Sequence, residues 1–148
     1  MTGYRQALLL DNSAWARAMD ERLAGSPRKR FDAALTVGEL WTCPPSLLEM
    51  LYSARDEKGF ALTGGRLSAL MHAPLTAATG ARAVSAQAEL AAAPGVSHRV
   101  KPVDLLIAAV AATNELGVLH YDRDYDVISE HTSLSFASVW VAPRGSID

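Results

Sequence analysis

The sequence predicts an α/β protein with a short, mainly parallel central sheet flanked by helices. Short apolar runs alternate along the chain with longer segments whose apolar residues recur at helical spacing. The apolar runs end at turn-forming groups, as the run at 7–10 ends at Asp-Asn-Ser. Buried strands that are separated by helices in this way are expected to pair in parallel.

The N-terminal part of the chain is expected to fold as strand, helix, helix, strand and helix. Residues 7–10 form the first strand, and Asn12 or Ser13 is placed to cap the helix that follows. Gly25-Ser26-Pro27 is expected to close this helix, and prolines 44 and 45 to end the second strand. The other expected elements are a helix at 28–40, a strand at 41–43 and a helix that begins near Ser46.

The rest of the chain predicts further helices around two more strands. Residues 57–81 carry the weakest pattern, because glycines 64 and 65 are expected to interrupt a helix and 76–80 to form a loop. Pro102 fits the first turn of a helix that runs to about Leu116, with Gly117 as its stop. The remaining expected elements are an alanine-rich helix at 81–93, a strand at 118–120, a short helix at 127–130 and a last strand at 136–141.

Length and composition limit the classes of protein that the chain can represent. Its 148 residues suffice for one domain with one core, spanning 1–148. The net charge of −2 argues against a protein that coats nucleic acid broadly. Cys43, the single cysteine, makes neither an internal disulfide nor a zinc cluster and is expected in the core. Without a signal peptide or an apolar run of membrane length, we expect a cytoplasmic protein with no membrane contact.

Four acidic residues stand in well-separated, otherwise apolar neighbourhoods: Asp11, Glu49, Asp104 and Asp122. A carboxylate beside a hydrophobic run costs free energy unless a positive charge meets it. Asp11 and Asp122 lie just past the ends of predicted strands, and Glu49 and Asp104 lie in the first turns of predicted helices. Ligands of parallel sheets bind at the carboxyl ends of the strands, so all four are expected to face one crevice.

Each acidic residue also has a structural alternative. Asp11 can begin a turn or cap a helix, and Glu49 can close a capping box with Ser46. Asp104 can complement a helix dipole, and Asp122 belongs to a turn whose acids can cap the next helix. Caps and turns do not, however, require four carboxylates at one end of one sheet. A site whose ligands are all oxygens favours Mg²⁺ or Mn²⁺. Such an ion can activate a water molecule that attacks a phosphodiester.

The four acidic segments together resemble the PIN-domain ribonucleases, and among them the VapC-type toxins of bacterial toxin–antitoxin pairs. LLLDNSAW at 8–15 is similar to the family's first strand and first acid, and CPPSLLEMLYSAR at 43–55 to its glutamate segment. HRVKPVDLLIAAVAA at 98–112 and VLHYDRDYDVI at 118–128 resemble the segments of the third and fourth acids. The resemblance covers nearly the whole chain in order and implies a PIN-like fold.

The resemblance implies a Mg²⁺- or Mn²⁺-dependent endoribonuclease that hydrolyses RNA and that a cognate VapB-type antitoxin inhibits. Asp11 and Asp104 would be the direct metal ligands, and Glu49 and Asp122 would complete the catalytic pocket. Asp124 is an alternative to Asp122 as the fourth acid. The resemblance also implies a homodimer.

RNA binding requires positive charge near these acids. Arg99 and Lys101, shortly before Asp104, are the expected substrate-binding residues. Tyr121 and Tyr125 flank the acidic turn and are candidates for stacking on bases. His98 and His120 are interpreted as structural, because a metal-activated water removes the need for a general base.

Two other enzyme classes with acids at strand ends are excluded by single positions. A phosphoacceptor receiver domain needs a lysine late in the chain, and the last lysine here is Lys101. A haloacid-dehalogenase-type phosphatase needs a second aspartate two residues after the first, where this chain has Ser13. The alternative that stays open is a PIN-like module that has lost cleavage but still binds RNA or an antitoxin.

Overall fold

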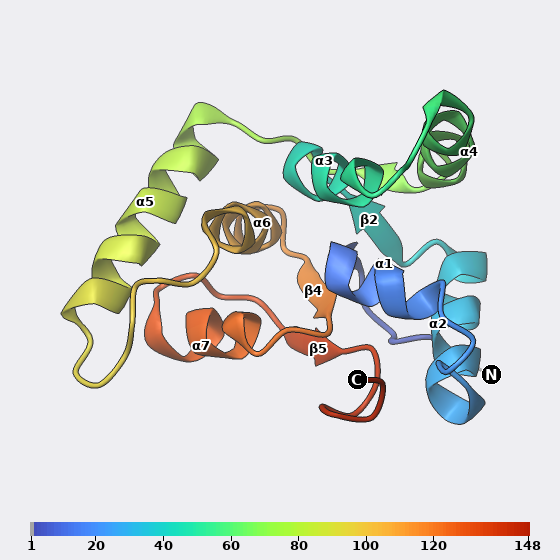
Figure 1. Cartoon of the computed structure of the whole chain (residues 1–148). Coiled ribbons are helices and arrows are strands. Elements are labelled where there is room, and N and C mark those ends of the chain that lie inside the picture. The colour runs from blue at the N-terminus through green and yellow to red at the C-terminus, as the bar shows by residue number, and fades with distance from the viewer. Residues whose placement is uncertain (1) are drawn as a thin grey trace.

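A computed structural model describes residues 2–148 and contains one parallel sheet of five strands in that range. The strands are β1 (Leu8–Leu10), β2 (Leu40–Thr42), β3 (Met71–His72), β4 (Gly117–His120) and β5 (Ser138–Trp140). Their order in the sheet is β3-β2-β1-β4-β5, and every neighbouring pair is parallel (Figure 1). The predicted α/β class is confirmed, and the sheet is parallel throughout.

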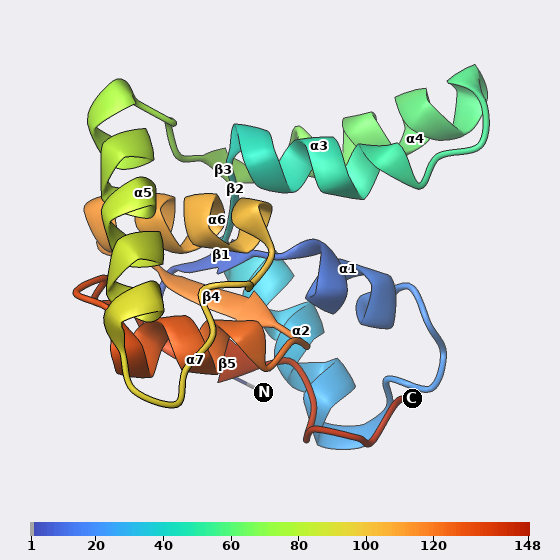
Figure 2. The same ribbon diagram turned by 60° about the vertical axis from the view of Figure 1, so that its left-hand side comes forward.

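Helices cover both faces of this sheet. In the described part of the chain they are α1 (Asn12–Ala18), α2 (Gly25–Val37), α3 (Pro44–Tyr52), α4 (Glu57–Leu67), α5 (Ala77–Ala92), α6 (Pro102–Thr113) and α7 (Asp124–His131). The alternation of side chains along β1 sends Leu9 to the face that α5, α6 and α7 cover. It sends Leu8 and Leu10 to the opposite face, which α1 and α2 cover. In Figure 2, α3 and α4 lie side by side and project beyond the sheet.

The strand order reverses between β1 and β4. From β1 the chain passes to β2 and then β3 on one side, whereas β4 and β5 lie on the other side. Such a switch point leaves an open crevice at the carboxyl ends of the two strands. Asp11 directly follows β1, and Asp122 lies two residues after β4. The fold therefore places two of the predicted acids on either side of this crevice.

The first helices begin and end at other residues than the sequence predicts. Gly25-Ser26-Pro27 was expected to close the first helix, but α1 ends at Ala18 and these residues begin α2. Proline is tolerated in the first turn of a helix, so the same residues suit a start as well as a stop. Arg28 stabilises the change of direction, because its side chain donates to the carbonyl oxygens of Ala18 and Leu23. The residue that ends α2 is Gly38, which adopts a left-handed conformation with φ of 76°, so α2 stops before Leu40.

The start of α3 corrects the predicted capping box. The two prolines at 44 and 45 form its first turn, and Cys43 rather than Ser46 is the N-cap residue. Ser46 reaches back so that its Oγ accepts a hydrogen bond of 3.0 Å from the backbone N–H of Cys43. Cys43 is fully buried, as expected. The cap of α3 therefore does not engage Glu49, which removes the structural alternative for that residue.

Three further boundaries differ from the predictions. Glycines 64 and 65 lie inside α4 and do not break it. Thr76 caps α5 through its hydroxyl, so α5 begins at Ala77 inside the segment that was expected to be a loop. The last helix, α7, begins at Asp124 rather than at residue 127.

Candidate metal centre

Asp11 is held at the carboxyl end of β1 by the helix that follows it. It is the N-cap residue of α1: its Oδ2 accepts hydrogen bonds from the backbone N–H of Ser13, at 2.8 Å, and from the Ser13 hydroxyl. Its other oxygen, Oδ1, accepts a hydrogen bond of 2.6 Å from the hydroxyl of Tyr125. The side chain is 4% exposed. Capping and site formation thus use the same buried carboxylate.

Asp104 lies in the first turn of α6 and is 2% exposed. The Tyr125 hydroxyl is 3.2 Å from its Oδ1. Its Oδ2 is buried, and no residue in 2–148 donates a hydrogen bond to it. An unpartnered buried carboxylate oxygen is costly, and this one is free to bind a ligand.

The four predicted acids come together as two overlapping groups. The Glu49 trio consists of Asp11, Glu49 and Asp104, each of which offers an oxygen within 4.8 Å of the others. The Asp122 trio consists of Asp104, Asp122 and Asp124 and meets the same limit. Asp104 belongs to both trios, so the centre is continuous. The two candidates for the fourth acid, Asp122 and Asp124, lie in it together.

Burial and mutual repulsion raise the pKa of the carboxyl groups at the middle of the centre. The pKa of Asp104 is raised to about 8, first by burial and then by the negative charges of Asp11 and Asp122. Burial, followed by the charge of Asp11, also raises the pKa of Glu49. Near neutral pH, a positive ion would replace the proton that Asp104 otherwise retains.

Asp122 is the acid whose charge the protein itself neutralises. Its Oδ2 accepts a hydrogen bond of 2.8 Å from Nζ of Lys101, and its Oδ1 accepts one of 2.9 Å from the backbone N–H of Asp124. Burial acts to raise the pKa of Asp122, but these hydrogen bonds and the charge of Lys101 together lower it. Lys101, predicted to bind substrate, therefore lies against the acidic centre in the protein without ligands.

Tyr125 is the residue of this site that the sequence did not reveal. Tyr121 and Tyr125 were candidates for base stacking, and this prediction is wrong because both rings are buried. The Tyr121 hydroxyl accepts a hydrogen bond from the backbone N–H of Ile147, whereas the Tyr125 hydroxyl lies between Asp11 and Asp104. The available signal was a tyrosine in the first turn of α7, between Asp124 and Asp126.

His120 fixes the turn that presents Asp122. Its Nδ1 accepts a hydrogen bond of 3.1 Å from the backbone N–H of Asp122, so the proton resides on Nε2, which lies 2.7 Å from the Ser138 hydroxyl. Ser138 in turn donates to Asp126, which also accepts from the indole of Trp140. Burial lowers the pKa of His120 to about 4, so the ring is neutral. Asp126 is occupied by this network and lies outside both trios.

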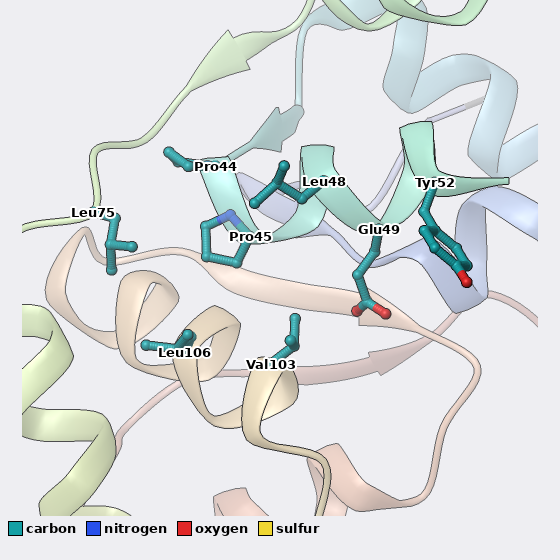
Figure 3. Close-up of a pocket in the computed structure, with 8 residues that line it drawn as sticks. All are labelled: Pro44, Pro45, Leu48, Glu49, Tyr52, Leu75, Val103 and Leu106. Atoms are coloured by element: carbon teal, nitrogen blue, oxygen red, sulfur yellow. The ribbon is translucent and has the colours of Figure 1, made fainter. Parts of the chain in front are cut away.

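An apolar hollow adjoins the acidic centre (Figure 3). It has a volume of about 450 Å³, is lined by residues of α3 and α6, and reaches Glu49. Figure 3 shows the Glu49 side chain reaching from α3 toward the side of α6 that carries Val103. Leu48 and Tyr52, on the same helix as Glu49, are 72% and 89% exposed.

The donor set fits a hard divalent cation. Every candidate ligand is a carboxylate oxygen, which is the type that Mg²⁺ and Mn²⁺ prefer. The unpartnered Oδ2 of Asp104 and the raised pKa of that residue are the features that a bound cation would relieve. The residues present are therefore suited to such an ion.

Comparison with known proteins places these features in a family. The model of the PIN domain matches residues 8–130 of the chain. The ribonuclease VapC18 of Mycobacterium tuberculosis is 36% identical over 139 residues, which cover 93% of this chain and 97% of the relative.

Two solved structures are similar in fold. A DNA-bound VapBC complex from Salmonella typhimurium contains a chain that matches with a TM-score of 0.71 at 20% identity, covering 93% of this chain and 99% of that one. VapBC-5 from Mycobacterium tuberculosis, a member of the VapBC family of toxin–antitoxin systems, matches with a TM-score of 0.58 at 24% identity, covering 90% and 98%. None of the helices within 2–148 has the length and apolar character needed to cross a membrane.

Proposed function

Because this chain belongs to the PIN-domain family and to its VapC group, we propose that it is a Mg²⁺- or Mn²⁺-dependent endoribonuclease, the toxin of a toxin–antitoxin pair. The observation that supports this most directly is the buried, unpartnered Oδ2 of Asp104 between two trios of carboxylates. A cationic ligand satisfies that oxygen and removes the repulsion between the acids. An RNA substrate would place the activity in the cytoplasm.

Asp11 and Asp104 are the proposed direct metal ligands, with Glu49 beside them in the first trio. Asp122 and Asp124 extend the centre past Asp104. A cation held here supplies an activated water and stabilises the charge that develops on the phosphodiester oxygens. Tyr125 holds Asp11 and Asp104 in position through its hydroxyl, and burial of both carboxylates excludes bulk water.

Lys101 and Arg99 are the proposed substrate-binding residues. Lys101 is exposed along its side chain, and its Nζ lies at the edge of the acidic centre, where a scissile phosphate would approach. Its contact with Asp122 reduces the local negative charge that would otherwise repel RNA. Arg99 precedes it on the same exposed segment and would contact the RNA away from the scissile phosphate.

The proposed partner is a cognate antitoxin of the VapB type. The similar Salmonella and Mycobacterium structures are VapBC complexes. On this chain, the apolar hollow beside Glu49 and the exposed Leu48 and Tyr52 provide a surface next to the active centre. A homodimer is also proposed, with the apolar side chains of α4, Phe60 and Leu62, as contact surface, since they are 51% and 58% exposed.

The proposed activity is tested by measuring RNA cleavage and Mn²⁺ binding on the same protein. We expect the wild type to bind Mn²⁺ in calorimetry and to cut single-stranded RNA, leaving a 5′-phosphate. Asp11→Asn and Asp104→Asn should lose both properties while keeping the fold. Asp32→Asn is the matched control, because Asp32 is an exposed carboxylate on α2, away from the centre. A wild type that folds but neither binds Mn²⁺ nor cuts RNA would favour the inactive binding module instead.

A further inference from the structure

A second, polar hollow lies beyond the acidic centre, on the side away from Glu49. It has a volume of about 360 Å³ and is formed by the loop between α5 and α6 and by α7. Figures 1 and 2 both show this loop running beside α7. Among its lining residues are Ser97, Arg99, Arg123 and His131, which all offer hydrogen-bond donors. The hollow is thus lined by donors from two segments that are distant in sequence.

The guanidinium groups of the two arginines of this hollow have no polar partner in the described part of the chain. Within 2–148, neither the Arg99 nor the Arg123 guanidinium donates a hydrogen bond or lies within 4.0 Å of a carboxylate, and both residues are exposed. Other arginines of the chain do have such roles. Arg28 donates to three backbone carbonyls, and Arg22 pairs with Asp20 at 2.7 Å. The cations of the hollow are therefore available to an external anion.

The hollow is continuous with the acidic centre through Asp124. This residue lines the hollow and also belongs to the Asp122 trio, and Arg123 stands between Asp122 and Asp124 in the chain. An oxygen of Asp124 lies within 4.8 Å of oxygens of Asp104 and Asp122, so the Asp124 carboxylate is part of the acidic centre. A strand of RNA whose scissile phosphate lies at the carboxylates therefore reaches this hollow with a neighbouring part of its backbone.

We propose that this hollow binds a second phosphate of the RNA backbone, next to the one that is cut, through Arg99 and Arg123, with Ser97 and His131 as further donors. The proposal rests on the proposed ribonuclease function. Arginine suits this role because its planar guanidinium donates two parallel hydrogen bonds to phosphate oxygens. The site would contact the phosphate backbone and not the bases, so it would add affinity for RNA without sequence preference.

The test compares RNAs that differ in the number of phosphates, using the full wild-type chain with Ca²⁺ in place of Mn²⁺ to prevent cleavage. A dinucleotide with one internal phosphodiester should bind equally to this protein and to the same protein with Arg99→Ala and Arg123→Ala. A tetranucleotide should bind the first protein more tightly than the dinucleotide, and the arginine substitutions should remove most of that gain. Each arginine lost should also reduce the slope of log affinity against log salt by about 0.7, the value for one phosphate contact on a single strand.

Arg66→Ala is the control, because Arg66 is an exposed arginine on α4, away from the hollow. It should change neither the length dependence nor the salt slope. In the active protein, the two substitutions in the hollow should raise KM for a long RNA about tenfold and leave kcat unchanged.

Two outcomes would overturn the subsite: an unchanged gain from dinucleotide to tetranucleotide in the double variant, or an equal loss for both RNAs. If the wild type cuts RNA and either result is obtained, the subsite is wrong and the nuclease assignment stands. If the wild type neither cuts nor binds any RNA in the presence of Mn²⁺, the proposed function itself fails.

Discussion

At the scale of single residues, Asp104 couples the protein's stability to pH. Its pKa is about 8 in the folded protein, raised by burial and by the neighbouring acids from an ordinary value of 3.8. Between these two values the folded state keeps a proton that the unfolded state releases. The stabilisation is thus complete below about pH 3.8 and is lost as the pH rises through about 8.

We therefore expect the metal-free wild type to lose unfolding free energy between pH 6.5 and 8.5, by at most about 1.4 kcal/mol per pH unit. Asp104→Asn should flatten this slope and be more stable than the wild type at pH 8.5. Urea unfolding in a chelator measures both. The window starts at pH 6.5 because His120 has the opposite effect at lower pH. Its pKa is lowered to about 4 in the folded protein, so the protein also loses stability as the pH falls below the ordinary value of 6.5. Equal slopes in the two proteins would show that Asp104 is already ionised.

Tyr125 is expected to support both the fold and the metal centre. Tyr125→Phe removes the hydroxyl that donates to Asp11 and lies 3.2 Å from Oδ1 of Asp104, and should destabilise the metal-free protein by about 1–3 kcal/mol. It should also weaken Mn²⁺ binding about 10- to 100-fold, because the two carboxylates lose the group that orients them. Tyr52→Phe is the matched control, since Tyr52 is 89% exposed. Calorimetry that finds wild-type Mn²⁺ affinity in Tyr125→Phe would rule out the orienting role.

The acidic residues were predictable from the sequence, whereas their hydrogen-bond partner was not. Asp11, Glu49 and Asp104 were noticeable because a charge beside apolar residues is conspicuous in any sequence. Tyr125 is compatible with a buried or an exposed position, and only the packing of α7 against the sheet decides between them. The bond between Tyr125 and Asp11 joins residues 114 positions apart, a separation at which local patterns carry no information.

At the scale of elements, glycine and proline were the least reliable guides. Pro27 and Pro44 each lie in the first turn of a helix, although proline after an expected helix or strand also predicts an end. Four of the five strands and most helices were predictable, because they follow from the periodicity of apolar residues, whereas the two-residue β3 lies in the segment with the weakest pattern and was not predicted. The boundaries depended on short-range contacts of Cys43 and Arg28, which residue type alone does not predict.

Two glycines provide a contrasting pair of predictions for the elements. Gly65 lies inside α4, and a Cβ there would meet nothing within 4 Å. Gly65→Ala should therefore stabilise the protein by about 0.5–1 kcal/mol, because alanine favours helix. Gly117 begins β4, and a Cβ there would come within 2.6 Å of a methyl group of Leu8 and 2.9 Å of the Ala137 carbonyl oxygen.

Gly117→Ala should consequently destabilise the protein by about 1–3 kcal/mol, since β1 and the chain before β5 would have to move apart. Urea unfolding of both variants gives the comparison. Opposite signs are expected; a stabilising Gly117→Ala would mean that the pairing of β1 with β4 is looser than the structure indicates.

At the scale of the whole molecule, a cation bound at the proposed centre would link distant segments of the fold. The candidate ligands follow β1 and β4 and lie in the second turn of α3 and the first turn of α6, so the unfolded chain cannot hold them together. Mn²⁺ at a hundredfold excess over its Kd should thus add about 2.7 kcal/mol to the unfolding free energy and raise the Tm. A chelator should reverse the shift, and Asp104→Asn should show none in a thermal melt. A shift of the same size in Asp104→Asn would place the ion elsewhere.

The pairing of β1 with β4 has a consequence for the cell that makes this protein. Strand β1 can gain β4 as its second neighbour, and Asp11 its tyrosine partner, only after residues 117–125 have been synthesised. A growing chain on the ribosome therefore holds its first acid but no complete centre for most of its translation. The centre can therefore form only once synthesis is nearly finished, a delay that arises from the order of the strands.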